Sequence, residues 1–271
     1  MPGSPARPSF LLGVLGGMGP LATVDFLAKL IDATPAVGDS DHVPCVAASI
    51  PQIPSRVAAI LAGGASPLPA LADARDRLLA AGATLLAMPC NTAHYWHDEL
   101  ARGIDAPFLH IADAAAGEVA ARVAPGAAVG VIATEATHAI GLYSTRLERA
   151  GCRVVVPRDA GDVRAVADGI AAVKRDDAEA GGRHFARVVA ALERAGAAAI
   201  VLGCTEVPPG LAAAGVRPGV PWVDPTDALA RACSAAWAQA RSGSAAGSCP
   251  AELTPPGCRP GRALDKPGPG P

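Results

Sequence analysis

"LLAAGATLLAMPCNTA" (residues 78–93) and "LERAGAAAIVLGCTEV" (residues 192–207) align without a gap, 114 positions apart. Each segment holds a helical leucine/alanine stretch, a glycine and an apolar run typical of a buried strand, and each run stops at a cysteine, Cys90 or Cys204. Two segments rich in alanine and glycine can align by chance, but the coincidence of the cysteines favours an internal repeat. The sequence therefore predicts two α/β units of one topology, the second beginning near residue 113.

Short apolar runs alternate with longer helical stretches along most of the chain. A second pair of segments, "GVLGGMG" (13–19) and "GVIATEA" (130–136), is related by a similar offset of 117 positions. The expected strands are residues 10–17, 43–50, 83–90, 107–112, 127–134, 152–157 and 197–204, and the expected helices include 67–81, 137–150, 162–174 and 183–195. Apolar strands joined by helical crossovers predict parallel sheets covered on both faces. The predicted fold class is α/β, with two related Rossmann-like parallel-sheet domains in pseudo-two-fold symmetry and the active site in the cleft between them.

The two ends of the chain differ from this pattern. Residues 1–9 and 241–271 are rich in proline, glycine and small residues, and they lack the apolar surface that would offset the entropy cost of ordering. The sequence predicts a flexible N-terminus and a disordered C-terminal tail.

Composition argues against several classes of function. The net charge is −2 and the basic residues are dispersed, so we expect no nucleic-acid partner and no membrane partner. Uninterrupted apolar runs of about 18 residues are absent, and "MPGSPARPSF" (1–10) lacks the apolar segment of a secretory signal. The seven cysteines form no C-x-x-C pair, which argues against a zinc site, and the acidic residues form no paired constellation for metal chemistry. We therefore expect no metal, reduced thiols and a cytoplasmic location.

The two strand-end cysteines are the main candidates for chemistry. Ligands of parallel α/β sheets bind beyond the carboxyl ends of the strands, where Cys90 and Cys204 are expected to lie. A thiol at a helix N-terminus can have a lowered pKa, whereas a single buried cysteine is usually an inert core residue. Two thiols facing each other across a cleft can remove a proton from one face of a carbon and return one to the other. This arrangement predicts racemisation or epimerisation without a metal or pyridoxal phosphate.

Substrate recognition has weaker candidates. Arg56 lies in "SIPQIPSRV" (49–57), where two prolines restrict the loop, and its guanidinium could bind a carboxylate or could simply be solvated. Lys174 ends an expected helix, where a lysine often only balances the helix dipole. The glycines of "GVLGGMGPLAT" (13–23) do not have the G-x-G-x-x-G spacing, so they give little support to dinucleotide binding.

Several motifs together resemble the aspartate racemase branch of the aspartate/glutamate racemase superfamily, in the right order between residues 10 and 240. They are "GVLGGMGPLATVDF", "PQIPSR", "MPCNTAHYW", "ATEATHAIGLYSTRLERAG", "IAAVK" and "VLGCTEVP". The resemblance implies a cofactor-independent enzyme, commonly a homodimer, in which Cys90 and Cys204 are the opposed acid and base. It also implies that the last helix (224–240) returns to the first domain, giving domains of 10–112 plus 221–240 and 113–220. The substrate contacts that it implies are Ser55, Arg56, Val57, Asn91, Thr92, Ala93 and Lys174, together with Met18, Thr134 and Thr205.

Within that superfamily, aspartate is the expected substrate. Glutamate racemases resemble the chain less, since they carry Asp-Ser-Gly near the N-terminus and histidine after the second Cys-Thr, where this chain has Met18 and Glu206. Ser55 stands where many members have an acid, which could alter substrate preference. A glutamate, broad-specificity or hydantoin racemase, a maleate isomerase and a decarboxylase of arylmalonate type remain alternatives. A non-catalytic small-molecule binding protein and a nucleotide-dependent oxidoreductase are the alternatives from other classes.

Overall fold

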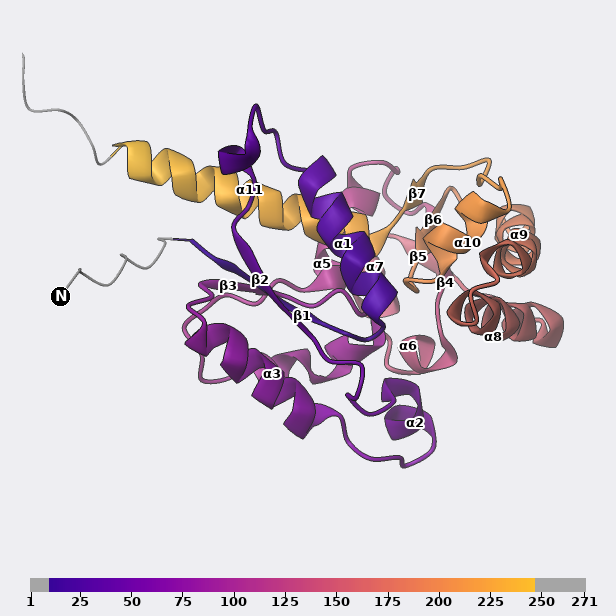
Figure 1. Ribbon diagram of the computed structural model, residues 1–271. Coiled ribbons are helices and arrows are strands. Elements are labelled where there is room, and N and C mark those ends of the chain that lie inside the picture. Colours follow the sequence, from indigo (N-terminus) through magenta and orange to yellow (C-terminus); the bar gives the residue numbers. More distant parts are fainter. Residues whose placement is uncertain (1–9, 247–271) are drawn as a thin grey trace, which may run out of the picture.

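A computed structural model describes residues 10–246 and contains two parallel β-sheets flanked by helices (Figure 1). The first sheet has the strand order β2-β1-β3 and the second has the order β5-β4-β6-β7. The strands are β1 (Leu12–Gly16), β2 (Cys45–Ser49), β3 (Leu85–Ala87), β4 (Ala128–Ile132), β5 (Arg153–Val155), β6 (Ala199–Leu202) and β7 (Trp222–Val223). In both sheets the first strand of the unit lies in the centre, and every paired strand runs parallel to its neighbour. The α/β class and the shared topology of the two units are confirmed.

One packing contact explains why the sequence repeats. A Cβ atom on Gly13 of β1 would lie 3.2 Å from the Cβ of Leu78, and a Cβ on Gly130 of β4 would lie 3.2 Å from the Cβ of Leu192. Leu78 and Leu192 are equivalent positions of the aligned segments. In each unit a leucine from the helix before the third strand thus packs directly on a glycine of the central strand, and a larger side chain there would force the helix away.

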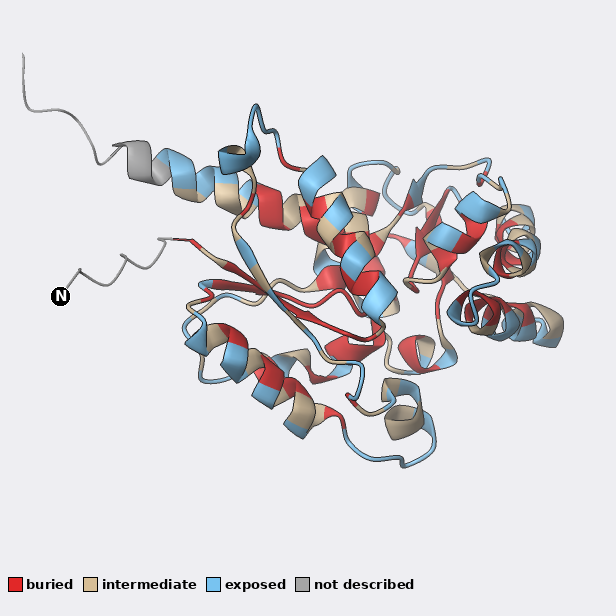
Figure 2. Cartoon of the chain, in the orientation of Figure 1, coloured by how far each residue is buried: buried red, intermediate tan, exposed pale blue. Residues whose placement is uncertain are grey.

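The helices cover the sheets on both faces, which leaves the central strands buried (Figure 2). Helix α3 packs on β1, helices α8, α9 and α10 pack together beside the second sheet, and α11 lies against α1 and α5. The α-helices are α1 (Pro20–Asp32), α2 (Arg56–Leu61), α3 (Leu68–Ala80), α4 (His97–Ala101), α5 (Ile111–Ala120), α6 (Glu135–Ala139), α7 (Ser144–Arg149), α8 (Ala160–Lys174), α9 (Ala178–Arg194), α10 (Val207–Ala213) and α11 (Pro225–Ala246), and the 3-10 helices are η1 (Asp39–Asp41) and η2 (Thr92–Trp96). Among the described residues, no helix is long and apolar enough to cross a membrane.

Three elements differ from the sequence-based expectation. Residues 107–112 do not form a strand, because only Phe108 bridges to β3 before α5 begins at Ile111. The helix expected over 137–150 is two helices, α6 and α7, separated at Gly141, whose φ of +65° is left-handed. The third difference is that residues 241–246, which the sequence predicts to be disordered, continue helix α11.

The extension of α11 has a local cause. Arg241 forms an ion pair with Asp41 and lies over the ring of Trp237, contacts that stabilise the helix beyond residue 240. The flexible N-terminus expected over 1–9 and the rest of the expected tail, 247–271, lie outside the described residues. Residues 222–223, assigned with the first domain from the sequence, add strand β7 to the second sheet before α11 returns along α1.

Candidate active site

Cys90 lies three residues beyond the end of β3, where the chain turns into η2. Its side chain is buried among Met18, Ile53 and other apolar residues of the first unit. Its carbonyl accepts a hydrogen bond of 2.8 Å from Nδ1 of His94, whose Nε2 accepts from the N–H of Ile111 at 3.1 Å. Burial, followed by the nearby His110, holds the pKa of His94 well below its usual range, so the ring is neutral and fits this pattern of one donor and one acceptor. His94 therefore fixes the backbone that carries Cys90.

Cys204 occupies the equivalent position beyond β6. Its thiol donates a hydrogen bond of 2.9 Å to Oε2 of Glu206, which also accepts one of 3.1 Å from the hydroxyl of Thr205. The other carboxylate oxygen of Glu206 lies 3.8 Å from Nζ of Lys174, at the end of α8. Lys174, Glu206 and Cys204 thus form a chain of charged and polar contacts from the surface to the buried sulfur.

The environment of Cys204 overturns the expectation of an acidic thiol at this position. Burial raises the pKa of Cys204 well above its ordinary value, and the adjacent Glu206 carboxylate raises it further, while Lys174 opposes the shift. A partial positive charge at a helix end is outweighed here because the sulfur is almost fully buried and an anion accepts its proton. Cys204 is therefore a protonated thiol at neutral pH in the unliganded protein.

Tyr143 connects the two strand tips. Its hydroxyl donates a hydrogen bond to Oδ1 of Asn91, the residue after Cys90. On the other side, a Cβ on Gly203, the residue before Cys204, would lie 2.8 Å from Cε2 of the same ring. The tyrosine hydroxyl therefore bonds to the residue after Cys90, and its ring packs against the residue before Cys204, so the two cysteine loops lie on either side of one side chain.

Three threonine hydroxyls form a second connection between the units. Thr92 Oγ1 lies 2.9 Å from Oγ1 of Thr137 and 3.3 Å from Oγ1 of Thr134, and the last two lie 2.9 Å apart. Thr134 also caps α6 by accepting from the N–H of Thr137. This cluster holds the loop after Cys90 against the start of α6.

The Arg56 loop is held by its own hydrogen bonds. Ser55 caps α2 by accepting from the N–H of Ala58. The guanidinium of Arg56 donates to the carbonyls of Ile53, Pro54 and Met18 at 3.1–3.3 Å. Three of its five N–H donors are thus satisfied within the described structure, and two remain for a ligand.

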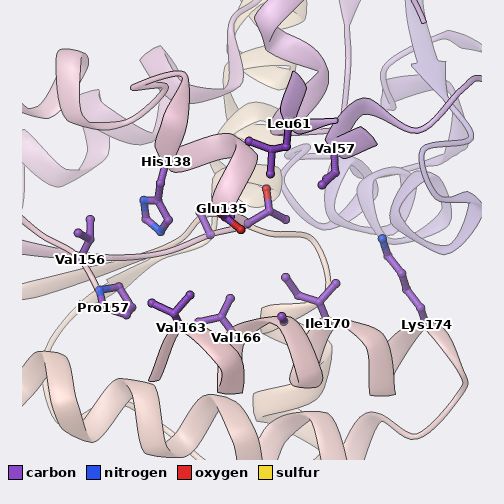
Figure 3. A pocket seen from close by; sticks show the side chains of 13 residues that line it. Val57, Leu61, Glu135, His138, Val156, Pro157, Val163, Val166, Ile170 and Lys174 are labelled. Atoms are coloured by element: carbon purple, nitrogen blue, oxygen red, sulfur yellow. The ribbon is translucent and has the colours of Figure 1, made fainter. Parts of the chain in front are cut away.

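A cavity of about 480 Å³ lies between α2, α6 and α8 (Figure 3). Three residues expected to contact substrate, Val57, Thr134 and Lys174, contribute to its wall, whereas the two cysteines do not. Ala93 is fully buried, and Asn91 and Thr92 are nearly so, and none of the three lines this cavity.

Tyr143 and Glu206 are the residues near the thiols whose roles the sequence did not indicate. Both residues belong to motifs that carry the family resemblance. Neither spacing nor composition, however, indicates the hydrogen bond between Tyr143 and Asn91, which lie 52 positions apart in the sequence. Within residues 10–246, His, Cys, Asp and Glu form no cluster able to hold a metal ion.

Comparison with known proteins defines the class to which this fold and site belong. The family model for Asp/Glu/hydantoin racemase matches residues 15–233. The chain therefore belongs to the Asp/Glu/hydantoin racemase family, whose enzymes are isomerases.

Individual relatives agree with this assignment. The structure of Picrophilus torridus aspartate racemase is 30% identical, covers 86% of this chain and 98% of that chain, and superimposes with a TM-score of 0.74. The broad specificity amino-acid racemase RacX of Bacillus subtilis is 29% identical over 147 residues, which are 54% of this chain and 63% of RacX. The match thus spans less than two thirds of that curated relative. Glutamate racemase from Francisella tularensis, 17% identical with a TM-score of 0.56 over 86% of this chain and 82% of that one, shares the fold.

Proposed function

We propose that the protein interconverts L- and D-aspartate without a cofactor, with Cys90 and Cys204 as the acid–base pair. The observation that carries the proposal is that Tyr143 contacts the neighbours of both cysteines, at equivalent strand ends of two repeated units. The similarity to an aspartate racemase over most of both chains supports the choice of substrate.

The protonated state of Cys204 assigns the roles in one direction of the reaction. Cys90, as thiolate, removes the α-proton from one face, and the electron pair left on Cα takes the proton that the Cys204 thiol releases on the other face. Cys90 then holds the proton taken from the substrate and Cys204 is a thiolate, so the enzyme is ready for the opposite enantiomer. Release of the proton from Cys90 to solvent and uptake of a solvent proton by Cys204 restore the starting state, and a thiol that has taken up solvent deuterium delivers it to Cα in the next turnover.

Cationic groups near the thiols can hold the substrate and stabilise the developing negative charge. The two remaining donors of Arg56 and the ammonium group of Lys174 are suited to carboxylates. In this proposal Arg56 binds one carboxylate of aspartate, and Lys174 leaves Glu206 in part to bind the other.

We further propose that the protein is a homodimer of the cytoplasm, where the thiols would stay reduced. Helix α1 has an exposed apolar face made of Leu21, Val24, Ala28 and Ile31. Successive members are three or four residues apart, so they lie on one side of the helix. A continuous apolar helix face of this kind is typical of a surface covered by another subunit. A second copy of the chain is the occupant proposed here.

The decisive experiment is incubation with L-aspartate in deuterium oxide without added cofactor. We expect deuterium at Cα together with D-aspartate, followed by NMR and chiral chromatography. Cys90→Ala and Cys204→Ala should each lower racemisation by at least about 100-fold, the typical contribution of one positioned acid or base. Cys45→Ala, at an exposed cysteine, is the matched control and should retain full activity.

The outcomes separate the alternatives. Full two-way turnover in either active-site variant would refute the two-thiol mechanism. A stable covalent adduct on one cysteine, detected by mass spectrometry, would instead favour an isomerase that uses one thiol as a nucleophile.

A further inference from the structure

We infer that the cavity between α2, α6 and α8 is a side-chain subsite that admits amino acids with apolar side chains larger than that of aspartate. The inference rests on the proposed racemase function and extends its substrate class.

Three lining residues of the cavity are next to, or in contact with, residues of the candidate active site. Val57 follows Arg56, Thr134 hydrogen-bonds Thr92, and Lys174 pairs with Glu206 beside Cys204. A substrate held by its α-carboxylate among these groups can therefore extend its side chain into the cavity.

The wall of the cavity is mostly aliphatic. Figure 3 shows side chains of α2 facing a row of side chains on α8, with those of α6 between them. The apolar lining residues are Val57, Leu61, Ala133, Val156, Pro157, Val163, Val166, Ala167 and Ile170. The cavity of about 480 Å³ falls within the range of about 300–1,000 Å³ that is usual for pockets holding small ligands. It is larger than the side chain of aspartate, one methylene and a carboxylate, requires.

The charges around the cavity favour an apolar occupant. Among the lining residues, all of which the structure describes, Lys174 is the one cation at neutral pH, and it lies at the mouth, with its side chain 57% exposed. His138 is neutral because burial lowers its pKa, and its buried Nε2 has no hydrogen-bond partner in the described structure. Glu135 adds a negative charge. A carboxylate placed deep in the cavity would lose its hydration without gaining a cationic partner, whereas an aliphatic or aromatic side chain would lose nothing.

The opposing explanation is that the cavity is space into which α2 and α8 close around aspartate. Ala167 distinguishes the two, because it is an exposed position of α8 that lines the cavity, so a larger residue there fills the space with little risk to folding. Arg164 is an exposed position of the same helix that does not line the cavity, and Arg164→Phe is the matched control.

The test measures kcat/KM for α-deuterium exchange with L-phenylalanine, L-leucine and L-aspartate in deuterium oxide. We expect the unmodified protein to exchange all three. Ala167→Phe should lower the phenylalanine-to-aspartate ratio at least tenfold, since a misfit of even one methylene in an apolar pocket costs about 10–200-fold. Arg164→Phe should leave the ratio unchanged.

Each other outcome overturns a defined part of the argument. Exchange with aspartate but not with phenylalanine or leucine refutes the subsite and leaves the proposed racemase standing. An equal loss for all substrates in Ala167→Phe shows that the cavity serves closure, which also refutes the subsite. Exchange with no amino acid refutes the racemase and the subsite together.

Discussion

Tyr143→Phe should destabilise the protein and slow racemisation at once. The substitution removes the hydroxyl that donates to Oδ1 of Asn91 and keeps the ring that packs on Gly203. Tyr143 is 2% exposed and Asn91 is 4% exposed, so water cannot readily replace the lost donor. The side-chain oxygen of Asn91 is then buried without its partner.

The expected size of the effect follows from that unpaired oxygen. Leaving one buried acceptor unsatisfied costs about 1–3 kcal/mol of unfolding free energy. For a domain of this size, each kcal/mol lowers Tm by about 2–4 °C. Asn91 also adjoins Cys90, and a misplacement of about 1 Å in a catalytic group can cost about 100-fold in rate. We expect kcat/KM to fall by about 10- to 100-fold.

Thermal unfolding and α-deuterium exchange with aspartate measure the two effects separately. Tyr95→Phe is the matched control, because Tyr95 is the other tyrosine of the chain and is 53% exposed, so both quantities should stay unchanged. If Tyr143→Phe retains the full Tm and the full rate, the hydroxyl does not organise the site and the argument that joins the two cysteines through Tyr143 fails. A lower Tm with an unchanged rate would limit the hydroxyl to a structural role.

Two further predictions concern the resting thiol and the exposed helix face. In the direction of the reaction in which Cys204 acts as the base, the rate should rise with pH as the thiol deprotonates. Glu206→Gln should move this rise to lower pH, because removing the carboxylate lowers the pKa of Cys204. A pH–rate profile whose rise does not move would contradict this. Val24→Asp should convert a dimer to monomers in analytical ultracentrifugation, whereas Val37→Asp, in the exposed loop after α1 and outside its apolar face, should not. A dimer that survives Val24→Asp places the interface elsewhere.

The fold could be predicted because its determinants are local. A glycine in each central strand and a leucine in each preceding helix recur in the sequence at the same spacing, and each pair is in contact in the structure. The positions of Cys90 and Cys204 follow from the ends of the neighbouring strands, β3 and β6. The break between α6 and α7 was missed because a glycine within a helical pattern is tolerated in many helices, and only its left-handed φ shows that the helix ends there.

The properties of the site depend on contacts that the sequence does not display. Two features raise the pKa of Cys204. One is its burial in a core cluster to which β4, α8, α9, β6 and α10 contribute, and the other is the carboxylate of Glu206, two residues later, which accepts its hydrogen bond. The interaction of Tyr143 with Asn91 joins the two units and has no periodic pattern. The sequence pattern therefore indicates where the two thiols lie but predicts the wrong direction for the pKa shift of Cys204.

The repeat breaks its symmetry beside the two strand-end cysteines. Counting 114 positions onward, Thr92 of the first unit aligns with Glu206 of the second. The Thr92 hydroxyl bonds to threonines across the unit boundary, whereas the Glu206 carboxylate accepts the proton of its own unit's thiol. Cys90 and Cys204 thus lie at equivalent points of the backbone, but the residue two positions later is a neutral threonine after Cys90 and an anion in contact with the thiol after Cys204. Because the carboxylate raises the pKa of Cys204, the repeat places one of its two strand-end thiols beside a charge that favours the protonated form.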